Sequence, residues 1–545
     1  MPESALRRRW GIAAACLAAV VIPVVIASGC APLRMMPWDY SILLDGAWRI
    51  LHGQIPHRDF YAPIGAVPLL VYSAGLRISG TVDALAWGAS LLALVVFRLA
   101  WFVSRSRLSA PAAFAFTAMA GLLVLAPRSL GLPPTHLGYA MHYNRIGWDF
   151  VAMAILLLLP RRGVADNRLG QLDDALAGAL CGLLLFVKIN YFLAAVCIGA
   201  AFLVLNVRRL RTACSAFASG LVVVSFGVFA YLRFDLSDWL GDLRMAAASA
   251  ATRGALQGAM DRVKRIVDTG WYSADVLAIA AVVFWLICRS GRGRSGLIRI
   301  VLPAVVMVPF GFLICSTNAQ PSDIPLIPLA LLVTAELFER SAGTAERGTR
   351  QAVSILALLS VAWIAAPDLA SVAYAAGWNA TAKRRLPEED RIQSNVMRDL
   401  SLPRMPPEIG ESEEETWRHY FARPEDLDGT PHEYLQWLNS GIALLRPHVG
   451  PATRVVSLEA ENPYPFALQL PPPHGGALYW HYGLGFTDAA HPDPGRTLRE
   501  ADLVIVPRIS STENLAKILG LFGPLLERDF RQIDENRIFR LYARK

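Results

Sequence analysis

The sequence predicts an all-α membrane domain that crosses the bilayer about eleven times, followed by a small extracytoplasmic α/β domain. Of the 545 residues, 54% are hydrophobic and 18% are charged, whereas a soluble domain has about a quarter charged residues. Apolar segments of about 20 residues, the length that a spanning helix needs, recur as far as residue 367. The composition then becomes that of a soluble domain, so we place the membrane domain at 1–375 and the soluble domain at 376–545.

Eleven segments are candidates for spanning helices. They are residues 10–29, 83–103, 110–127, 146–160, 173–187, 190–206, 213–232, 271–289, 298–316, 322–338 and 351–367. The first could instead be a lipoprotein signal cleaved before Cys30. Its apolar run is about 20 residues, which is long for a signal core and right for a spanning helix, so we favour an uncleaved helix.

The basic residues between these segments predict the orientation. The loops on one side carry Arg105 and Arg107, Arg161 and Arg162, Arg208, Arg209 and Arg211, Arg289, Arg292 and Arg294, and Arg340, Arg347 and Arg350. With Arg7 to Arg9 they place the N-terminus in the cytoplasm, because cytoplasmic loops are enriched in Lys and Arg. This alternation requires that 62–79, which contains two prolines and Arg77, lies in the interface instead of spanning. The net charge of +8 therefore indicates membrane topology and no nucleic-acid partner.

The C-terminal residues alternate between strand and helix patterns. We expect strands at 454–458, 477–480 and 503–507, helices near 495–501 and 513–527, and a closing pair of strands within 531–544, which together predict a small α/β layer domain. It has no GxGxxG fingerprint, so no nucleotide site is expected. The Pro-rich loop 462–476, which contains His474, is either a plain surface loop or a cover over a site on the membrane domain.

Ionisable groups concentrate in the external loop 30–82, just after the first spanning segment. Asp39 stands between Trp38 and Tyr40, and residues 41–52 have the pattern of an amphipathic interfacial helix. The turn "GQIPHRDF" then presents Arg58 and Asp59. An ordinary interfacial loop with belt aromatics would explain part of this pattern.

The order of these features resembles the first external loop of membrane glycosyltransferases of the GT-C class. That class includes bacterial polyprenyl-phosphate-sugar-dependent enzymes such as the aminoarabinose and mannosyl transferases. The resemblance implies that the chain transfers a sugar from a polyprenyl-phosphate donor to a lipid or glycan acceptor. It places the reaction on the extracytoplasmic face of the bacterial inner membrane and makes Asp39 the catalytic base, with Asp59 as a second candidate. Many metal-using relatives have two adjacent acids where this chain has one, so no cofactor and no obligatory divalent metal is expected.

Further polar groups fall at the outer ends of the predicted helices. Lys188, in "FVKINYF", can contact a phosphate or merely extend to the interface. Arg58, Arg262 and Arg265 are also candidates for donor phosphate binding, although Arg262 and Arg265 could instead contact anionic lipid head groups. Candidates for substrate binding are Tyr40, His142, Asn144, Asn190, Asn318, Gln320 and His474.

Two rival functions are a transporter or flippase of lipid-linked sugars and a non-catalytic membrane scaffold. Transporters often show repeated halves and broken helices at the bilayer midplane. This sequence has no internal repeat, and its polar groups fall at helix ends. These features favour the transferase.

Overall fold

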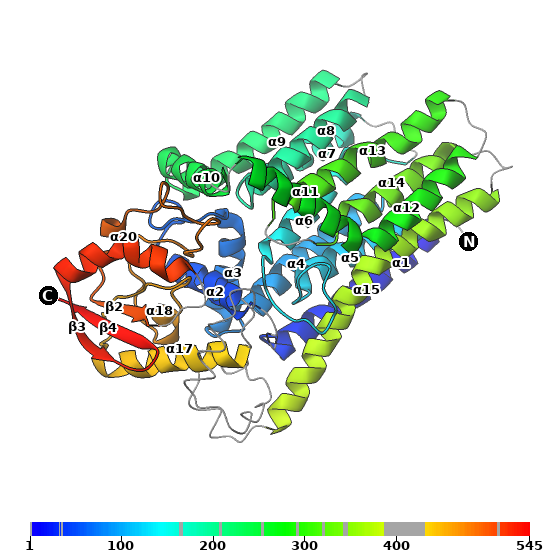
Figure 1. Cartoon of the computed structure of the whole chain (residues 1–545). Helices are drawn as coiled ribbons and strands as arrows, with labels where there is room; N and C mark the ends of the chain where they lie inside the picture. Colours follow the sequence, from blue (N-terminus) through cyan, green and yellow to red (C-terminus); the bar gives the residue numbers. More distant parts are fainter. Residues whose placement is uncertain are drawn as a thin grey trace.

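The computed structural model describes residues 3–31, 33, 36–162, 167–205, 210–251, 255–289, 294–318, 322–341, 347–385, 431–508 and 513–545. A large helical part and a smaller domain containing a β-sheet lie side by side along the long dimension of the molecule (Figure 1). The N-terminus lies at the far end of the helical part, and the C-terminus lies in the sheet domain at the opposite end.

Each predicted spanning segment is a helix in the structure. These helices are α1 (Glu3–Ser28), α4 (Ala84–Ser104), α5 (Ala110–Leu125), α6 (Tyr143–Leu157), α7 (Asn167–Leu185), α8 (Ile189–Leu205), α9 (Leu210–Tyr231), α12 (Ala274–Cys288), α13 (Arg294–Ser316), α14 (Leu326–Ser341) and α15 (Arg347–Arg385). Among the described residues, 5 helices are long and apolar enough to cross a membrane, namely α1, α4, α9, α13 and α15. α15 continues to Arg385, beyond the boundary expected at 375.

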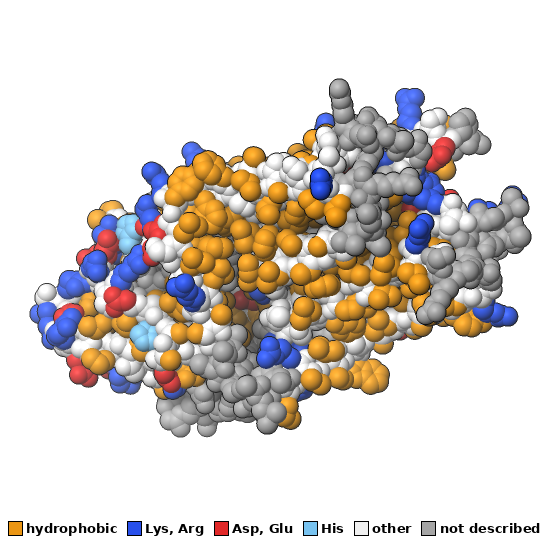
Figure 2. Space-filling model, turned by 90° about the horizontal axis from the view of Figure 1, so that it is seen from above, with side chains coloured by type: hydrophobic (Ala, Val, Ile, Leu, Met, Phe, Trp, Pro, Cys, Tyr) orange, Lys and Arg blue, Asp and Glu red, His pale blue; other side chains and the backbone are white. Residues whose placement is uncertain are grey.

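Apolar side chains cover the middle of the helical part, and charged side chains gather toward the two ends (Figure 2). At the end away from the sheet domain, loops that are distant in sequence meet. Arg162 lies 3.5 Å from Glu3 at the start of α1 and 2.6 Å from Glu336 near the end of α14. Arg340 donates to the Pro160 carbonyl at 3.0 Å. The loops of Arg162 and Arg340, two of the basic loops predicted to share one face, therefore share one end of the bundle.

The opposite end carries four helices that are not predicted spans: α2 (Pro37–Leu51), α3 (Ala66–Ser79), α10 (Leu236–Ala251) and α11 (Ala255–Tyr272). α3 has 14 residues, too few to cross a bilayer. Its start packs tightly on the turn between α7 and α8, where the Gly65 amide donates to the Val187 carbonyl at 3.0 Å. A Cβ on Gly65 would lie 1.9 Å from the Phe186 carbonyl oxygen, so only glycine permits this approach.

A buried charge network braces this end. The guanidinium groups of Arg128 and Arg145 lie 2.7 and 3.1 Å from the carboxylate of Asp368 on α15, and all three side chains are buried. Removing one partner of such a network would leave a buried charge uncompensated. The network therefore fixes the N-terminal end of α6 against α15.

The sheet domain contains α17 (Pro431–Leu445), a 3-10 turn (Arg446–His448), β1 (Val455–Ser457), α18 (Tyr464–Ala467), α19 (Pro494–Leu498), β2 (Leu503–Pro507), α20 (Glu513–Asp529), β3 (Phe530–Glu535) and β4 (Phe539–Arg544). The strand order is β1-β2-β4-β3, with β1 parallel to β2 and the other pairs antiparallel. The strand predicted at 477–480 is wrong. Its backbone instead pairs with the external loop, where Ala477 forms an isolated bridge with Tyr61.

The Pro-rich loop 462–476 packs on the external loop of the membrane domain. Gln54 Nε2 donates to the Pro472 carbonyl at 2.9 Å, and the Gly475 amide donates to the Asp59 carbonyl at 2.6 Å. The Tyr61 amide donates to the Gly476 carbonyl at 2.9 Å. Of the two interpretations of this loop, contact with the membrane domain is the one the structure shows.

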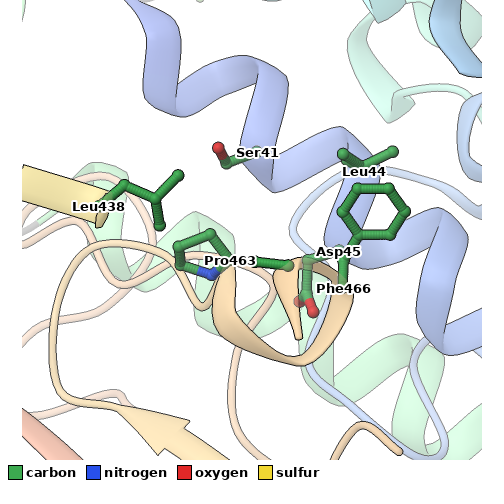
Figure 3. A pocket seen from close by; sticks show the side chains of 7 residues that line it. Ser41, Leu44, Asp45, Leu438, Pro463 and Phe466 are labelled. Carbon is green, nitrogen blue, oxygen red and sulfur yellow. The ribbon is translucent and has the colours of Figure 1, made fainter. Parts of the chain in front are cut away.

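A small, mostly apolar pocket lies where α2 meets the sheet domain (Figure 3). It is lined by Ser41, Leu44, Asp45, Leu438, Pro463, Phe466 and Ala467. On the helical wheel of α2, residues 41, 44 and 45 lie on the side opposite residue 39. The pocket is therefore a packing gap between α2 and the sheet domain, separate from Asp39.

Candidate active site

Asp39 lies in the first turn of α2, at the sheet-domain end of the helical bundle. Pro37 suits the first position of a helix because it has no amide hydrogen to leave unpaired. The Met141 amide donates a hydrogen bond to the Asp39 carboxylate. Met36, which precedes α2, and Met141 both have left-handed backbones, with φ of 45° and 49°. Such conformations are unfavourable for residues other than glycine and gather at functional sites.

The surroundings of Asp39 make its carboxylate a better base. Burial disfavours the charged form and raises the pKa of Asp39 to about 7, although the hydrogen bond from Met141 opposes this shift. The side chain nevertheless keeps part of its surface accessible. A general base is most effective when its pKa lies near the working pH.

Two tyrosines from distant parts of the chain lie close to this carboxylate. Tyr143 is the first residue of α6, and Tyr479 belongs to the sheet domain. Burial raises the pKa of both phenols, and the negative charge of Asp39 raises it further. Each keeps some accessible surface. The sheet domain therefore contributes a side chain to the surroundings of Asp39.

Lys188 also lies near Tyr143, in the turn between α7 and α8. Its ammonium nitrogen is 5.3 Å from the centroid of the Tyr143 ring and donates to Asn318 Oδ1 at 2.8 Å. Burial lowers the pKa of Lys188 to about 8. Among the residues that the structure describes, no carboxylate pairs with it. A cation with only neutral partners can accept an anion.

Asn318 joins Lys188 to two further predicted residues. The guanidinium of Arg265, on α11, donates to the Asn318 carbonyl. Beside it, Asn190 Nδ2 donates to Thr317 Oγ1 at 2.7 Å. Arg262 is exposed and lies almost one turn before Arg265 on α11. The structure thus brings Lys188, Asn190, Arg265 and Asn318 into one cluster next to Tyr143 and Asp39.

Arg58 and Asp59 are paired with each other in the turn after α2. Arg58 Nε donates to Asp59 Oδ1 at 3.0 Å, and Asp59 Oδ2 accepts the Ile55 amide at 2.7 Å. These contacts hold the shape of the turn. The backbone carbonyl of Asp59 in this turn accepts a hydrogen bond from the Gly475 amide.

Other predicted substrate residues lie outside the cluster. His142 Nδ1 is 2.7 Å from the Tyr72 hydroxyl, and burial, assisted by the charge of Arg145, lowers the pKa of His142 to about 3. Tyr40 packs 5.2 Å from Tyr139, ring centre to ring centre. Asn144 is buried in α6.

The last two predicted substrate residues are His474 and Gln320. His474 is exposed and pairs with Glu500 at 2.8 Å, and Gln320 lies outside the described residues. Among the residues that are described, no three His, Cys, Asp or Glu side chains are close enough to hold a metal ion together.

Tyr479 is the main site residue that the sequence did not indicate. It follows a Gly-Gly pair inside a segment predicted to be a strand, and no local pattern marks its ring as a neighbour of Asp39. The proximity depends on the pairing of 476–478 with Tyr61, a contact across more than 400 positions of chain.

No family model matches the chain, and no curated protein matches it. Among solved structures, the chain is similar to the crystal structure of ArnT from Cupriavidus metallidurans bound to undecaprenyl phosphate. The identity is 13% over 97% of both chains, with a TM-score of 0.50. The same protein in the apo state gives 12% identity over 97% of both chains and a TM-score of 0.39.

A third similar structure is the Archaeoglobus fulgidus oligosaccharyltransferase in complex with Zn and sulfate. It gives 11% identity over 90% of this chain and 68% of that chain, with a TM-score of 0.28. The likeness to ArnT with bound lipid, which extends over nearly the whole of both chains, shows the fold. The chain therefore shares the fold of ArnT, and its described residues include 5 helices long and apolar enough to cross a membrane, in agreement with the helical membrane domain that the sequence predicted.

Proposed function

We propose that the chain is a glycosyltransferase that moves a sugar from a polyprenyl-phosphate donor to a hydroxyl of a lipid or glycan acceptor on the extracytoplasmic face of the bacterial inner membrane. The observation that carries this proposal is that Asp39 and Lys188 both lie against Tyr143, a base and a cation at the same end of the helical bundle. The similar ArnT structure contains undecaprenyl phosphate, which supports a lipid phosphate as donor.

The two groups divide the chemistry between them. The carboxylate of Asp39 accepts the proton of the acceptor hydroxyl while the oxygen of that hydroxyl attacks the anomeric carbon of the sugar. The bond between the anomeric carbon and the phosphate oxygen breaks, and the electron pair leaves with the polyprenyl phosphate. The ammonium of Lys188 stabilises the negative charge that develops on this phosphate.

The neighbouring polar groups have supporting roles in this proposal. Arg265 and Asn190 hold the residues that follow α13, including Asn318, and the side chain of Asn318 in turn orients Lys188. Tyr143 and Tyr479 limit water around Asp39 and keep its pKa raised. We assign Arg58 and Asp59 to the turn that seats the sheet domain, with Asp59 as a less direct contributor to catalysis than Asp39.

The decisive experiment uses the full chain in lipid nanodiscs with undecaprenyl-phosphate sugars and candidate acceptors, and follows the acceptor mass by mass spectrometry. Asp39→Asn keeps the side-chain shape and removes the base. We expect kcat to fall by about 10² to 10⁴, with little change in the donor KM.

Asp59→Asn serves as the matched control and should reduce stability more than kcat. Near-full transfer by Asp39→Asn, at equal amounts of folded protein, would contradict the assignment of the base. Movement of the lipid-linked sugar across vesicle membranes without any transfer would favour the flippase instead.

A further inference from the structure

α11 has the reverse of the amphipathic pattern of a soluble helix. Met260, Val263, Val267 and Trp271 are 65%, 61%, 52% and 76% exposed. Their spacing of three and four residues places them in one stripe along the helix. Thr269, on the opposite side, is fully buried. A helix at a water-facing surface buries its apolar stripe and exposes its polar one, so the medium around this stripe is apolar.

α11 does not continue the direction of the neighbouring spanning segment. The stretch Met260–Trp271 is bent by 73° relative to Ala274–Cys288 of α12. α12 exposes Val282, Phe284 and Trp285 to the surroundings, as the apolar middle of the helical part does (Figure 2). The axis of α11 is therefore steeply inclined to that of α12, whose exposed side chains belong to the apolar belt. This is the arrangement of a helix lying in a membrane interface.

The opposite side of α11 reaches the candidate site. The helical wheel places Arg265 on the side of Thr269 and away from the stripe. Its guanidinium donates to the Asn318 carbonyl, and the Asn318 side chain accepts the bond from Lys188. The exposed cations Arg262 and Lys264 flank the stripe on the helical wheel, with Lys264 directly beside Trp271. At these edges anionic head groups would meet them.

We propose that α11 is an interfacial docking helix whose partner is one leaflet of the bilayer. The stripe lies among the acyl chains, and this seating holds Arg265 on Asn318 and thereby keeps Lys188 in place. The membrane contact stands independently of the proposed function, whereas the effect on donor binding rests on it.

The membrane contact can be measured on the full chain in nanodiscs without any substrate. The chain has 14 tryptophans, so the signal of Trp271 is taken as the difference between the unmodified protein and Trp271→Phe. We expect phospholipids brominated near the top of the acyl chain to quench this signal more than acrylamide in the water does. Quenching by acrylamide alone would overturn the proposal, because it would place the stripe in water.

The link to the site is tested by placing a charge within the stripe. Val267→Glu should raise the apparent KM for undecaprenyl-phosphate sugar several-fold, while Val267→Leu, which keeps the position apolar, should leave it near the unmodified value. In a Lys188→Met background, Val267→Glu should add no further increase. An unchanged KM in Val267→Glu, at equal folded protein, overturns the link. A full further increase in the double variant shows that α11 acts by another route and overturns it equally.

The two measurements separate the possible failures. If no sugar transfer is detected with any acceptor while Trp271 is quenched by bromolipid, the proposed function fails and the membrane contact stands. If transfer is robust but Trp271 responds only to acrylamide, the proposed function stands and the docking helix fails.

Discussion

Asp39 and Lys188 are carboxyl and ammonium groups whose pKa values burial moves toward neutrality, from opposite directions. The pKa of Asp39 is raised to about 7 and that of Lys188 is lowered to about 8. Burial has these opposite effects because it disfavours a charge of either sign. The two working forms, the carboxylate and the ammonium, therefore coexist mainly in a narrow range of pH between the two values.

This coexistence predicts a bell-shaped dependence of kcat/KM on pH. Activity should rise as the pH passes about 7, because Asp39 loses its proton and becomes a base, and fall above about 8, because Lys188 loses its charge. Initial rates at low donor concentration would measure the curve. Lys188→Arg should retain its charge and extend the alkaline side. An alkaline side that does not move in this variant would assign the upper pKa to another group.

Substitutions of Lys188 and Arg58 should differ in how much they raise the KM for the donor. Lys188→Met removes a cation that has neutral partners, so the donor KM should rise strongly while the amount of folded protein stays similar. Arg58→Met should change the donor KM less, because its guanidinium is already paired with Asp59. Titration of transfer rate against donor concentration gives both values. Equal donor KM values for the two variants and the unmodified chain would show that neither Lys188 nor Arg58 binds the donor phosphate.

The loop 462–476 depends on a glycine for its contact with the membrane domain. Gly475 has φ of +82°, and a Cβ there would lie 2.7 Å from the Arg496 carbonyl oxygen. Gly475→Ala should therefore destabilise the fold by about 1–3 kcal/mol, the usual cost of a strained backbone. Thermal unfolding in nanodiscs, monitored by circular dichroism, measures the change.

Gly520 provides the matched control for this substitution. It lies in α20 with no atom within 4 Å of an added Cβ, so Gly520→Ala should be neutral or stabilising by up to about 1 kcal/mol. Equal destabilisation by the two substitutions would show that the cost at Gly475 does not come from its backbone.

Sequence patterns predicted the helices of the long apolar segments well, because hydropathy is a local property. They also located Lys188, since a cation in the middle of a long apolar run must fall at a turn. The residues that surround Asp39 were harder to predict from the sequence. Tyr479 reaches it only because residues 476–478 pair with Tyr61, and Arg58 meets Asp59 through a turn geometry that residue types do not fix. Contacts between distant segments depend on the assembled fold, which no window of sequence contains.

At the scale of the whole molecule, the two ends of the bundle should face opposite sides of the membrane. The contacts of Arg162 and Arg340 gather basic loops at one end, and the sheet domain lies at the other. Following the preference of Lys and Arg for the cytoplasm, alkaline phosphatase fused after residue 545 should be active. The same reporter fused near residue 345 should be inactive, where a fluorescent protein should fold instead. A cytoplasmic residue 545 would contradict the proposed location of the site.

The bonding of residues 476 and 478 to Tyr61 also sets an order of assembly. During synthesis, α2 and its carboxylate emerge from the ribosome long before the segment that will lie against them. Until then the external loop has no partner for its exposed backbone, and the surroundings of Asp39 lack Tyr479. Contacts between such distant segments form slowly, because a long length of chain must first be ordered between them. A nascent or misassembled chain therefore carries an unfinished site, and the proposed sugar transfer should begin only when the last domain has folded onto the first loop.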